Sequence, residues 1–461
     1  MHPRMIPALA AALAAPAAPA ALPAQATAPA APIRVAYVLD SLPNGLRFIV
    51  HEDASAPMVA VNVWYYVGSG DEMPGRTGFA HLFEHLMFMG SEHAPYPAFD
   101  RLLEGAGANN NGSTNEDRTN YYEVGPANAL PLMLWLEADR MGWMLPTMDS
   151  AKVDLQRDVV KNERRQSYEN QPYGMVWDHI PRMLYPSGHP YSWPVIGSMT
   201  DLSAASLEDV KDFFRRYYAP NNAVVVVAGA VKADSVRALV QQYFGNIPRG
   251  PGITRATPVP HKLARDTSLV LEDRVQLARV YYGFPAVRAT APDDPVFGII
   301  GYLLTGAKNS RLTQPLVYDR QIASAVVAYP DLNRLDGEFM IIATARPGQA
   351  LPELQKVIDA ELSRLATEGP TARELDQARN SIEADFLNSL ETVMEKANLM
   401  NGYYFERGTP DGFQADLDAL REVSADDVQR VVRNYLLGAR VIVSVVPQGQ
   451  PEMAAAARAV P

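Results

Sequence analysis

The feature that most constrains the fold of this 461-residue chain is a long internal repeat. The segment 208–217 leads into a valine-rich segment at 223–227, and the pattern recurs at 426–435 and 441–445, where every residue number is higher by the same offset of 218. Such a repeat indicates two duplicated domains, because solenoid repeats have periods of about 20–50 residues. We therefore expect an α+β fold of two homologous α/β lobes that face each other as a clamshell. Each lobe would be a mixed, largely antiparallel sheet covered by helices.

A segment rich in proline and glycine separates the two copies. Four prolines and two glycines fall between positions 248 and 260, a composition typical of a stiff, exposed linker. We expect an N-terminal lobe over 27–244, a linker over 245–264 and a C-terminal lobe over 265–461. In the second half, apolar residues at helical spacing predict one long packing helix over 371–401.

The N-terminal segment 1–32 is mostly alanine and proline. His2 and Arg4 precede an apolar stretch over 6–22, and Ala24-Gln25-Ala26 has the form of an A-x-A cleavage site. We interpret residues 1–26 as a bacterial-type signal peptide, cleaved after Ala26; the alternative is a disordered Ala/Pro arm. The protein is therefore expected to be periplasmic or secreted. No membrane span is predicted, because prolines interrupt this stretch and no later segment has about 18 apolar residues in a row.

Composition narrows the possible chemistry. The chain carries 41 Lys and Arg against 52 Asp and Glu, a formal charge of −11, which argues against nucleic-acid binding because that requires clustered basic residues. It has no cysteine, which excludes disulfides, thiol nucleophiles and thiolate ligands. Any metal ion must therefore be held by histidine, aspartate or glutamate.

The most informative stretch is His81-Leu82-Phe83-Glu84-His85. Histidines four residues apart on a helix lie on one face, where both imidazoles can bind one metal ion. Glu84 is placed to take a proton from a metal-bound water without being a ligand itself. The arrangement is the inverted zincin motif, and a chance occurrence among 8 histidines is about one in a hundred. The alternative is a histidine pair on a core-packed helix, hydrogen-bonded to backbone.

A catalytic zinc ion needs a third protein ligand. A carboxylate would lower the charge of the site to +1 and leave one position for water. Candidate acids follow on two helical stretches, and spacing alone does not choose among Glu137, Asp139 and Glu163.

Several stretches together resemble one family. They are the zinc motif, Gly68-Ser69-Gly70, Asn111-Gly112-Ser113-Thr114 followed by Asp117, Thr119 and Tyr121, and Tyr217 with Pro220-Asn221-Asn222. From about Leu42 to Val446 the sequence resembles the pitrilysin, insulysin and mitochondrial processing peptidase family of zinc metallopeptidases. In that family a glutamate on a later helix rich in Arg and Val is the third ligand. The match here is 157–165, so the resemblance assigns that role to Glu163.

The resemblance also suggests how substrate binds. In such relatives the Asn-containing segment is an edge strand along which an extended peptide pairs. Asn111 is therefore a candidate substrate contact, and the alternative is a polar turn residue. Relatives often carry a second glutamate seven residues before the ligand, whereas this chain has Gln156, which can hydrogen-bond in the second shell of the metal but supplies no charge.

The C-terminal lobe departs from the family pattern at one position. Relatives carry an Arg/Tyr pair that grips the substrate carbonyl; Arg311 matches the arginine, but Ser324 stands at the tyrosine position. Arg311 is the candidate oxyanion donor. Because some bacterial relatives divide zinc and the Arg/Tyr pair between two chains, we expect a homologous partner subunit, or a homodimer. The offset of 218 maps His81 and His85 onto Ile299 and Leu303, so no metal is expected in the C-terminal lobe.

Together these features predict a zinc-dependent endopeptidase acting on peptides or unfolded segments. His81, His85 and Glu163 would hold Zn²⁺, and Glu84 would act as general base. The alternative is a catalytically silent homologous subunit with an assembly or peptide-binding role. A zinc hydrolase for a non-peptide substrate is a third, weaker interpretation.

Overall fold

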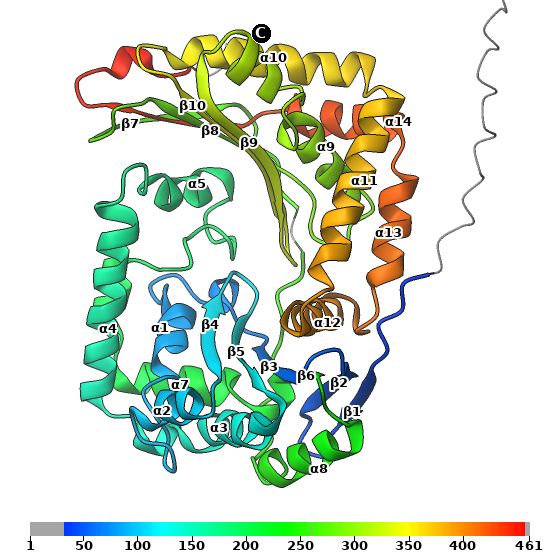
Figure 1. Ribbon diagram of the computed structural model, residues 1–461. Coiled ribbons are helices and arrows are strands. Elements are labelled where there is room, and N and C mark those ends of the chain that lie inside the picture. The colour runs from blue at the N-terminus through cyan, green and yellow to red at the C-terminus, as the bar shows by residue number, and fades with distance from the viewer. Residues whose placement is uncertain (1–31, 259, 457–461) are drawn as a thin grey trace, which may run out of the picture. The chain divides into compact units, whose positions relative to one another are not determined.

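The computed structural model describes residues 32–258 and 260–456, so the predicted signal peptide lies outside the described residues. The described residues from Arg34 onward belong to one compact unit, which is the unit described below. It contains two mixed sheets covered by helices (Figure 1), which confirms the α+β prediction. Among the described residues, no helix combines the length and apolar character needed to cross a membrane.

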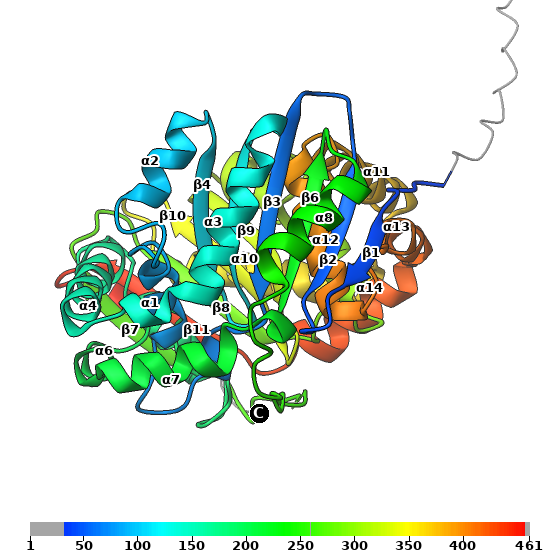
Figure 2. The same cartoon turned by 90° about the horizontal axis from the view of Figure 1, so that it is seen from below.

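The first half of the chain builds a six-stranded sheet in the order β1-β2-β6-β3-β5-β4. Only β2 and β6 run parallel; the other neighbours are antiparallel. The strands are β1 (Val38–Ser41), β2 (Arg47–Glu52), β3 (Met58–Tyr65), β4 (Asn109–Thr114), β5 (Thr119–Pro126) and β6 (Ala223–Gly229). The helices are α1 (Phe79–Leu86), α2 (Ala98–Gly105), α3 (Leu130–Trp143), α4 (Ser150–Arg164), α5 (Val176–Leu184), α6 (Met199–Ala204), α7 (Leu207–Tyr217) and α8 (Ala233–Phe244). All of them except α5 are labelled in the view from below in Figure 2.

The second half builds a five-stranded sheet in the order β7-β11-β8-β10-β9, in which only β7 and β11 are parallel. Its strands are β7 (Thr267–Asp273), β8 (Arg279–Pro285), β9 (Ala323–Leu332), β10 (Gly337–Ala345) and β11 (Val441–Pro447). Its helices are α9 (Asp294–Thr305), α10 (Leu351–Glu368), α11 (Ala372–Ser389), α12 (Val393–Arg407), α13 (Phe413–Glu422) and α14 (Ala425–Val431). Residues 245–266, between α8 and β7, contain no helix or strand among those described. The predicted lobe boundaries at 244 and 265 stay a prediction.

The two sheets confirm the predicted repeat. Their strand orders correspond one for one, with β1 as an addition to the first sheet. The offset of 218 superimposes the bounds of β6 on those of β11 and brings α1 onto α9. Ile299 and Leu303, which correspond to His81 and His85, are buried core residues of α9.

Each half also contributes a helix to the other half's sheet (Figure 1). Ile180 of α5 belongs to an apolar cluster with Met340 and Val443 of the second sheet. In return α12 packs on β3 and β6, where the side-chain amide of Asn401 donates to the Asn62 carbonyl at 3.0 Å. The prediction of one helix over 371–401 was therefore wrong. Helix α11 ends at Ser389 and a new helix, α12, begins at Val393. The Thr392 side chain caps the start of α12 by accepting a hydrogen bond from the Glu395 amide.

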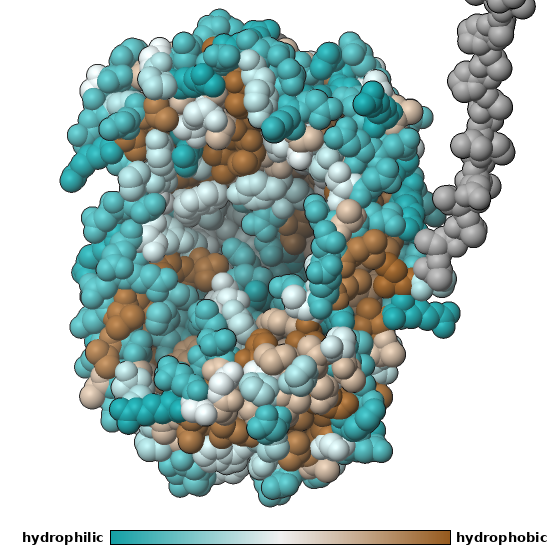
Figure 3. All heavy atoms as spheres, viewed as in Figure 1, coloured by the Kyte–Doolittle hydropathy of each residue, from teal (hydrophilic) through white to brown (hydrophobic). Residues whose placement is uncertain are grey.

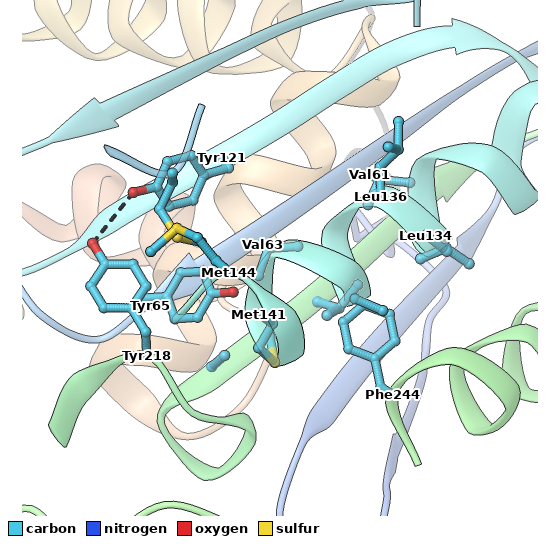
Figure 4. Packing of buried hydrophobic residues seen from close by; sticks show 14 of the residues in the cluster. Val61, Val63, Tyr65, Tyr121, Leu134, Leu136, Met141, Met144, Tyr218 and Phe244 are labelled. Carbon is cyan, nitrogen blue, oxygen red and sulfur yellow. Dashed lines mark hydrogen bonds between the residues drawn. The ribbon is translucent and has the colours of Figure 1, made fainter. Parts of the chain in front are cut away.

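The core of the first half lies between its sheet and α3. Val61, Val63 and Tyr65 point from β3 toward this core, as strand alternation predicts (Figure 4). The hydroxyls of Tyr121 and Tyr218 lie 3.3 Å apart there and hydrogen-bond. The surface between the two halves is not filled in this way. Figure 3, viewed as in Figure 1, shows that the surface is hollowed between the part built on the first sheet and the part built on the second.

Candidate functional site

Helix α1 presents the two motif histidines on one face. Gly78 adopts a positive φ of 87° immediately before the helix, a conformation that favours glycine. Leu82, Phe83 and Leu86 anchor the helix in the core and leave the imidazoles of His81 and His85 partly exposed. Their ring centroids lie 4.8 Å apart, so both rings can reach one ion.

Glu163 completes this group from α4. Its Oε2 lies 3.2 Å from His85 Nε2 and its Oε1 lies 3.7 Å from His81 Nε2. Tetrahedral ligands about 2.1 Å from a zinc ion lie about 3.4 Å from one another, so these separations suit a single zinc ion. Within residues 32–258 and 260–456, this is the only group of three or more His, Asp or Glu side chains whose ligand atoms converge in this way.

The charge states of His81 and Glu163 also suit a zinc ion. Burial, with the neighbouring His85, lowers the pKa of His81 to about 4, so its imidazole is neutral at pH 7 and can act as a ligand. A hydrogen bond from His85 lowers the pKa of Glu163, which is therefore a carboxylate. Two histidines and one carboxylate are a donor set found in catalytic zinc sites.

Glu84 lies on the same helix but outside the three-residue group. Burial raises the pKa of its carboxyl, and a hydrogen bond from the Thr114 hydroxyl to Oε2 at 2.7 Å partly offsets this rise. Strand β4 passes directly over the side chain. A Cβ atom placed on Gly112 would lie 3.1 Å from Glu84 Cγ, so any side chain at this position would require Glu84 to shift by a few tenths of an ångström.

The two other candidate ligands are engaged elsewhere. Glu137 is fully buried and accepts a 2.9 Å hydrogen bond from Arg140 Nε, while Arg140 also lies 3.3 Å from Glu123. Asp139 accepts hydrogen bonds from the Ser91 hydroxyl and from His93. Of the three acids that spacing left open, the two on α3 are therefore bound to other side chains, and only Glu163 lies beside the motif histidines.

The remaining predicted residues have different surroundings. Asn111 is an exposed residue of β4, which is an edge strand, as the resemblance implied. Gln156 donates to Met89 Sδ at 2.8 Å; within the described residues it makes no hydrogen bond to the three candidate ligands.

Arg311 is held within the second half. Its guanidinium is buried and donates to both carboxylate oxygens of Glu374 and to the Gly369 carbonyl, at 2.8–2.9 Å. Ser324, at the family tyrosine position, is exposed and donates to the Thr344 carbonyl. Among the described residues, neither side chain hydrogen-bonds to His81, Glu84, His85 or Glu163.

Two features of the site were missed at the level of sequence: the contact of Thr114 with Glu84, and the close approach at Gly112. Both residues lie in the segment 111–114, which the resemblance had marked as a motif. No spacing rule connects a residue of a strand with a helix residue thirty positions earlier, so only the structure shows what this motif does.

Two family descriptions match the chain. Residues 47–192 match the family described as Insulinase (Peptidase family M16), and residues 204–382 match the one described as Peptidase M16 inactive domain. The first match contains the candidate metal ligands, and the second covers most of the half in which Ile299 and Leu303 replace the two histidines.

Individual proteins are similar over nearly the whole chain. The zinc protease PqqE of Helicobacter pylori is 30% identical over 402 residues, which cover 86% of this chain and 89% of the relative. A probable mitochondrial-processing peptidase subunit beta of Arabidopsis thaliana is 25% identical over 88% of this chain and 77% of its own length. The crystal structure of a protease from Helicobacter pylori matches with a TM-score of 0.83 and 28% identity, covering 90% of this chain and 100% of that one.

Proposed function

The chain belongs to peptidase family M16, the insulinase family, and on this premise we propose that it is a zinc-dependent endopeptidase acting on peptides or unfolded segments. The observation that carries the proposal is the convergence of His81, His85 and Glu163 from two helices, with Glu84 beside them. A silent subunit has no need to keep all four side chains in this arrangement.

The residues divide the chemistry among them. His81, His85 and Glu163 would hold the zinc ion, which when bound would supply the Lewis acidity that makes water a nucleophile near neutral pH. Glu84 takes the proton from the attacking water and returns it to the leaving amine. The hydroxyl of Thr114 donates a hydrogen bond to the Glu84 carboxylate at 2.7 Å. The free edge of β4 offers backbone groups to an extended peptide, and pairing of this kind would place little demand on the peptide sequence.

We further propose that a homologous partner subunit, or a second copy of this chain, supplies the donor for the oxyanion. The proposal is supported by the engagement of Arg311 with Glu374 and Gly369, and by the short Ser324 side chain at the position of the family tyrosine. One missing oxyanion donor costs about 10²–10³ in kcat. An assay of the purified chain with and without any copurifying companion tests this, and full activity of the single chain would contradict it.

We also propose export to the periplasm or beyond the cell, supported by the A-x-A sequence at 24–26. N-terminal sequencing of the mature protein should find Thr27 as the first residue; an intact N-terminus at Met1 in the exported fraction would contradict the cleavage.

A peptide-library digest with and without a zinc chelator tests the main proposal. We expect cleavage within peptides that stops with chelator and returns with added zinc. Zinc binding without any cleavage, alone or with the companion, would instead favour the silent subunit with an assembly or peptide-binding role.

A further inference from the structure

The turn Asn115–Arg118, which joins β4 to β5, is packed tightly against the loop Gly68–Gly70 of its own half. The Ser69 amide donates to the Asn115 carbonyl at 3.1 Å and the Gly70 amide donates to the Glu116 carbonyl at 2.7 Å. A Cβ on Gly68 would lie 2.3 Å from the Asn115 oxygen, so the two segments are in direct backbone contact. The turn is therefore fixed from one side within the first half.

The second half holds the same turn from the other side, through Asp117. The Asp117 side chain is buried and accepts from the Arg334 amide at 2.7 Å and from the Tyr191 hydroxyl at 2.6 Å. The same Tyr191 hydroxyl accepts from the Leu335 amide at 3.0 Å. Arg334 and Leu335 belong to the turn 333–336 between β9 and β10, which the offset of 218 makes the counterpart of the turn 115–118. The two equivalent turns of the repeat thus meet through one buried carboxylate.

A second connection between the two halves lies on the face of the first sheet that α12 covers. The Asn401 amide of α12 donates to the Asn62 carbonyl, and the Asn120 amide donates to the Asn62 side-chain oxygen, both at 3.0 Å. Asn120 in turn accepts from the Ser113 hydroxyl at 2.6 Å. All three asparagines are buried, so these bonds are shielded from water. Both connections end on the β4–β5 hairpin.

This hairpin also carries the contact with the general base. Thr114 is the last residue of β4, three positions before Asp117, and its hydroxyl donates to Glu84. A shift of the turn would therefore move Thr114 relative to Glu84.

We propose that Asp117 and Thr114 are positioning residues for the general base: docking of the second half on Asp117 holds the β4–β5 turn where the Thr114 hydroxyl orients the Glu84 carboxylate. The catalytic part of this inference rests on the proposed peptidase function; the mechanical part, that the second half immobilises the hairpin, does not. Glu84 would then be correctly oriented only while the two halves are in contact.

Substitutions at Thr114, with Thr147 as a control, test the catalytic part. Thr114→Val removes the hydrogen bond to Glu84 and a longer one, 3.4 Å, to the Thr119 hydroxyl. Thr147→Val removes a hydroxyl that donates to the Met144 carbonyl, outside the hairpin, and serves as the matched control. We expect Thr114→Val to lower kcat about 10- to 100-fold with KM nearly unchanged, since hydrogen bonds to charged groups are the stronger ones. Thr114→Ser should restore kcat, and zinc content should stay at the wild-type value in all three variants. Wild-type kcat in Thr114→Val, or failure of Thr114→Ser to restore it, would overturn the role of Thr114.

Hydrogen exchange of the full chain tests the mechanical part without any activity assay. Asp117→Asn replaces the charged acceptor of the Arg334 amide by a neutral one, and Tyr191→Phe removes the hydroxyl that links Asp117 to the Leu335 amide. Each should speed amide exchange in 109–114 by at least about 10-fold, because each weakens the contact of the turn with the second half. Asp53→Asn is the matched control: it breaks the Asp53–Lys396 ion pair, which also joins the two halves but does not touch the hairpin. Unchanged exchange in 109–114 for both test variants, or equal acceleration in Asp53→Asn, would overturn the coupling. If the wild-type chain cleaves no peptide, either alone or with its companion, the proposed function fails while the exchange result still decides the coupling.

Discussion

Glu163 Oε2 lies 3.2 Å from His85 Nε2, although the two residues belong to different helices and stand far apart in the sequence. The contact exists because α4 packs against α1, and the buried Arg164 fixes the end of α4 through the Gly197 carbonyl and Asp178. The acid and the imidazoles are therefore held together by the fold of the first half, which is the preorganisation that a catalytic metal site requires.

Replacing Glu84 by glutamine should remove turnover and leave the metal site intact. Glutamine keeps the shape of the side chain but cannot accept the proton, so kcat should fall by about 10²- to 10⁴-fold. Steady-state kinetics and metal analysis of the same sample check both parts. Glu92→Gln, an exposed position shortly after α1, is the control and should behave as wild type. Unchanged turnover in Glu84→Gln would refute its assignment as the base.

Gly112→Ala should impair catalysis more than folding. The added Cβ would lie 3.1 Å from Glu84 Cγ and 3.3 Å from the Asn120 carbonyl, so Glu84 must shift by a few tenths of an ångström. A misplacement of about 1 Å can cost about 10²-fold, and we expect a smaller loss of kcat here. Gly105→Ala, where a Cβ meets open space, is the control. Wild-type kinetics in Gly112→Ala would show that the approach of β4 does not constrain the base.

Arg140→Met should destabilise the first half without affecting zinc. Glu137 and Glu123 are fully buried beside Arg140, and its removal would leave Glu137 without a countercharge. Losing one partner of a buried ion pair costs about 3–5 kcal/mol of the free energy of unfolding. Denaturant unfolding measures this difference. A variant as stable as wild type would mean that the buried charges are not coupled as the structure indicates.

The pair Arg311–Glu374 should make stability depend on pH in the acid range. Burial raises the pKa of Glu374, but the hydrogen bonds from Arg311 and Thr371 outweigh it and bring the pKa to about 2. Because this value lies below the ordinary 4.5, the unfolded state binds more protons between these pH values. The stabilisation is thus complete above pH 4.5 and is lost as the pH falls toward 2.

Glu374→Gln should accordingly lower the free energy of unfolding by about 1–2 kcal/mol at pH 7, which is less than the pKa shift alone implies because solvent screens this partly exposed carboxylate. The difference from wild type should shrink at pH 3. Glu353→Gln, which removes an exposed pair with Lys356, is the control and should change little at either pH. A difference for Glu374→Gln that stays constant between pH 7 and pH 3 would contradict the lowered pKa.

The sequence predicted the duplicated sheets because their pattern is local: valine-rich strands and the helices before them recur at the offset of 218. The apolar spacing over 371–401 led to the wrong prediction of one long helix, because the spacing continues across the point where Thr392 caps a new helix. The sequence also did not predict that α5 packs on the second sheet and α12 on the first. The offset shows that the two helices are equivalent, but it does not say which sheet each one covers.

Of the candidate site, the histidine pair could be predicted from the sequence pattern, but the third ligand could not. Histidines one turn apart are a local pattern, whereas the choice among Glu137, Asp139 and Glu163 depends on which face of α3 or α4 meets α1. Spacing left this open and only the family resemblance favoured Glu163. The structure adds the reason, because Glu137 is neutralised by Arg140 and Asp139 is bound by Ser91 and His93.

Zinc content of the purified chain is the most direct test of the central claim that His81, His85 and Glu163 hold one ion. Metal analysis should find about one zinc per wild-type chain and about one in Asp158→Asn, which changes an exposed carboxylate on the same helix. Glu163→Gln should lose most of its zinc at the same free metal concentration. Equal zinc content in Glu163→Gln and wild type, or a correctly folded wild-type chain that binds no zinc, would contradict the account.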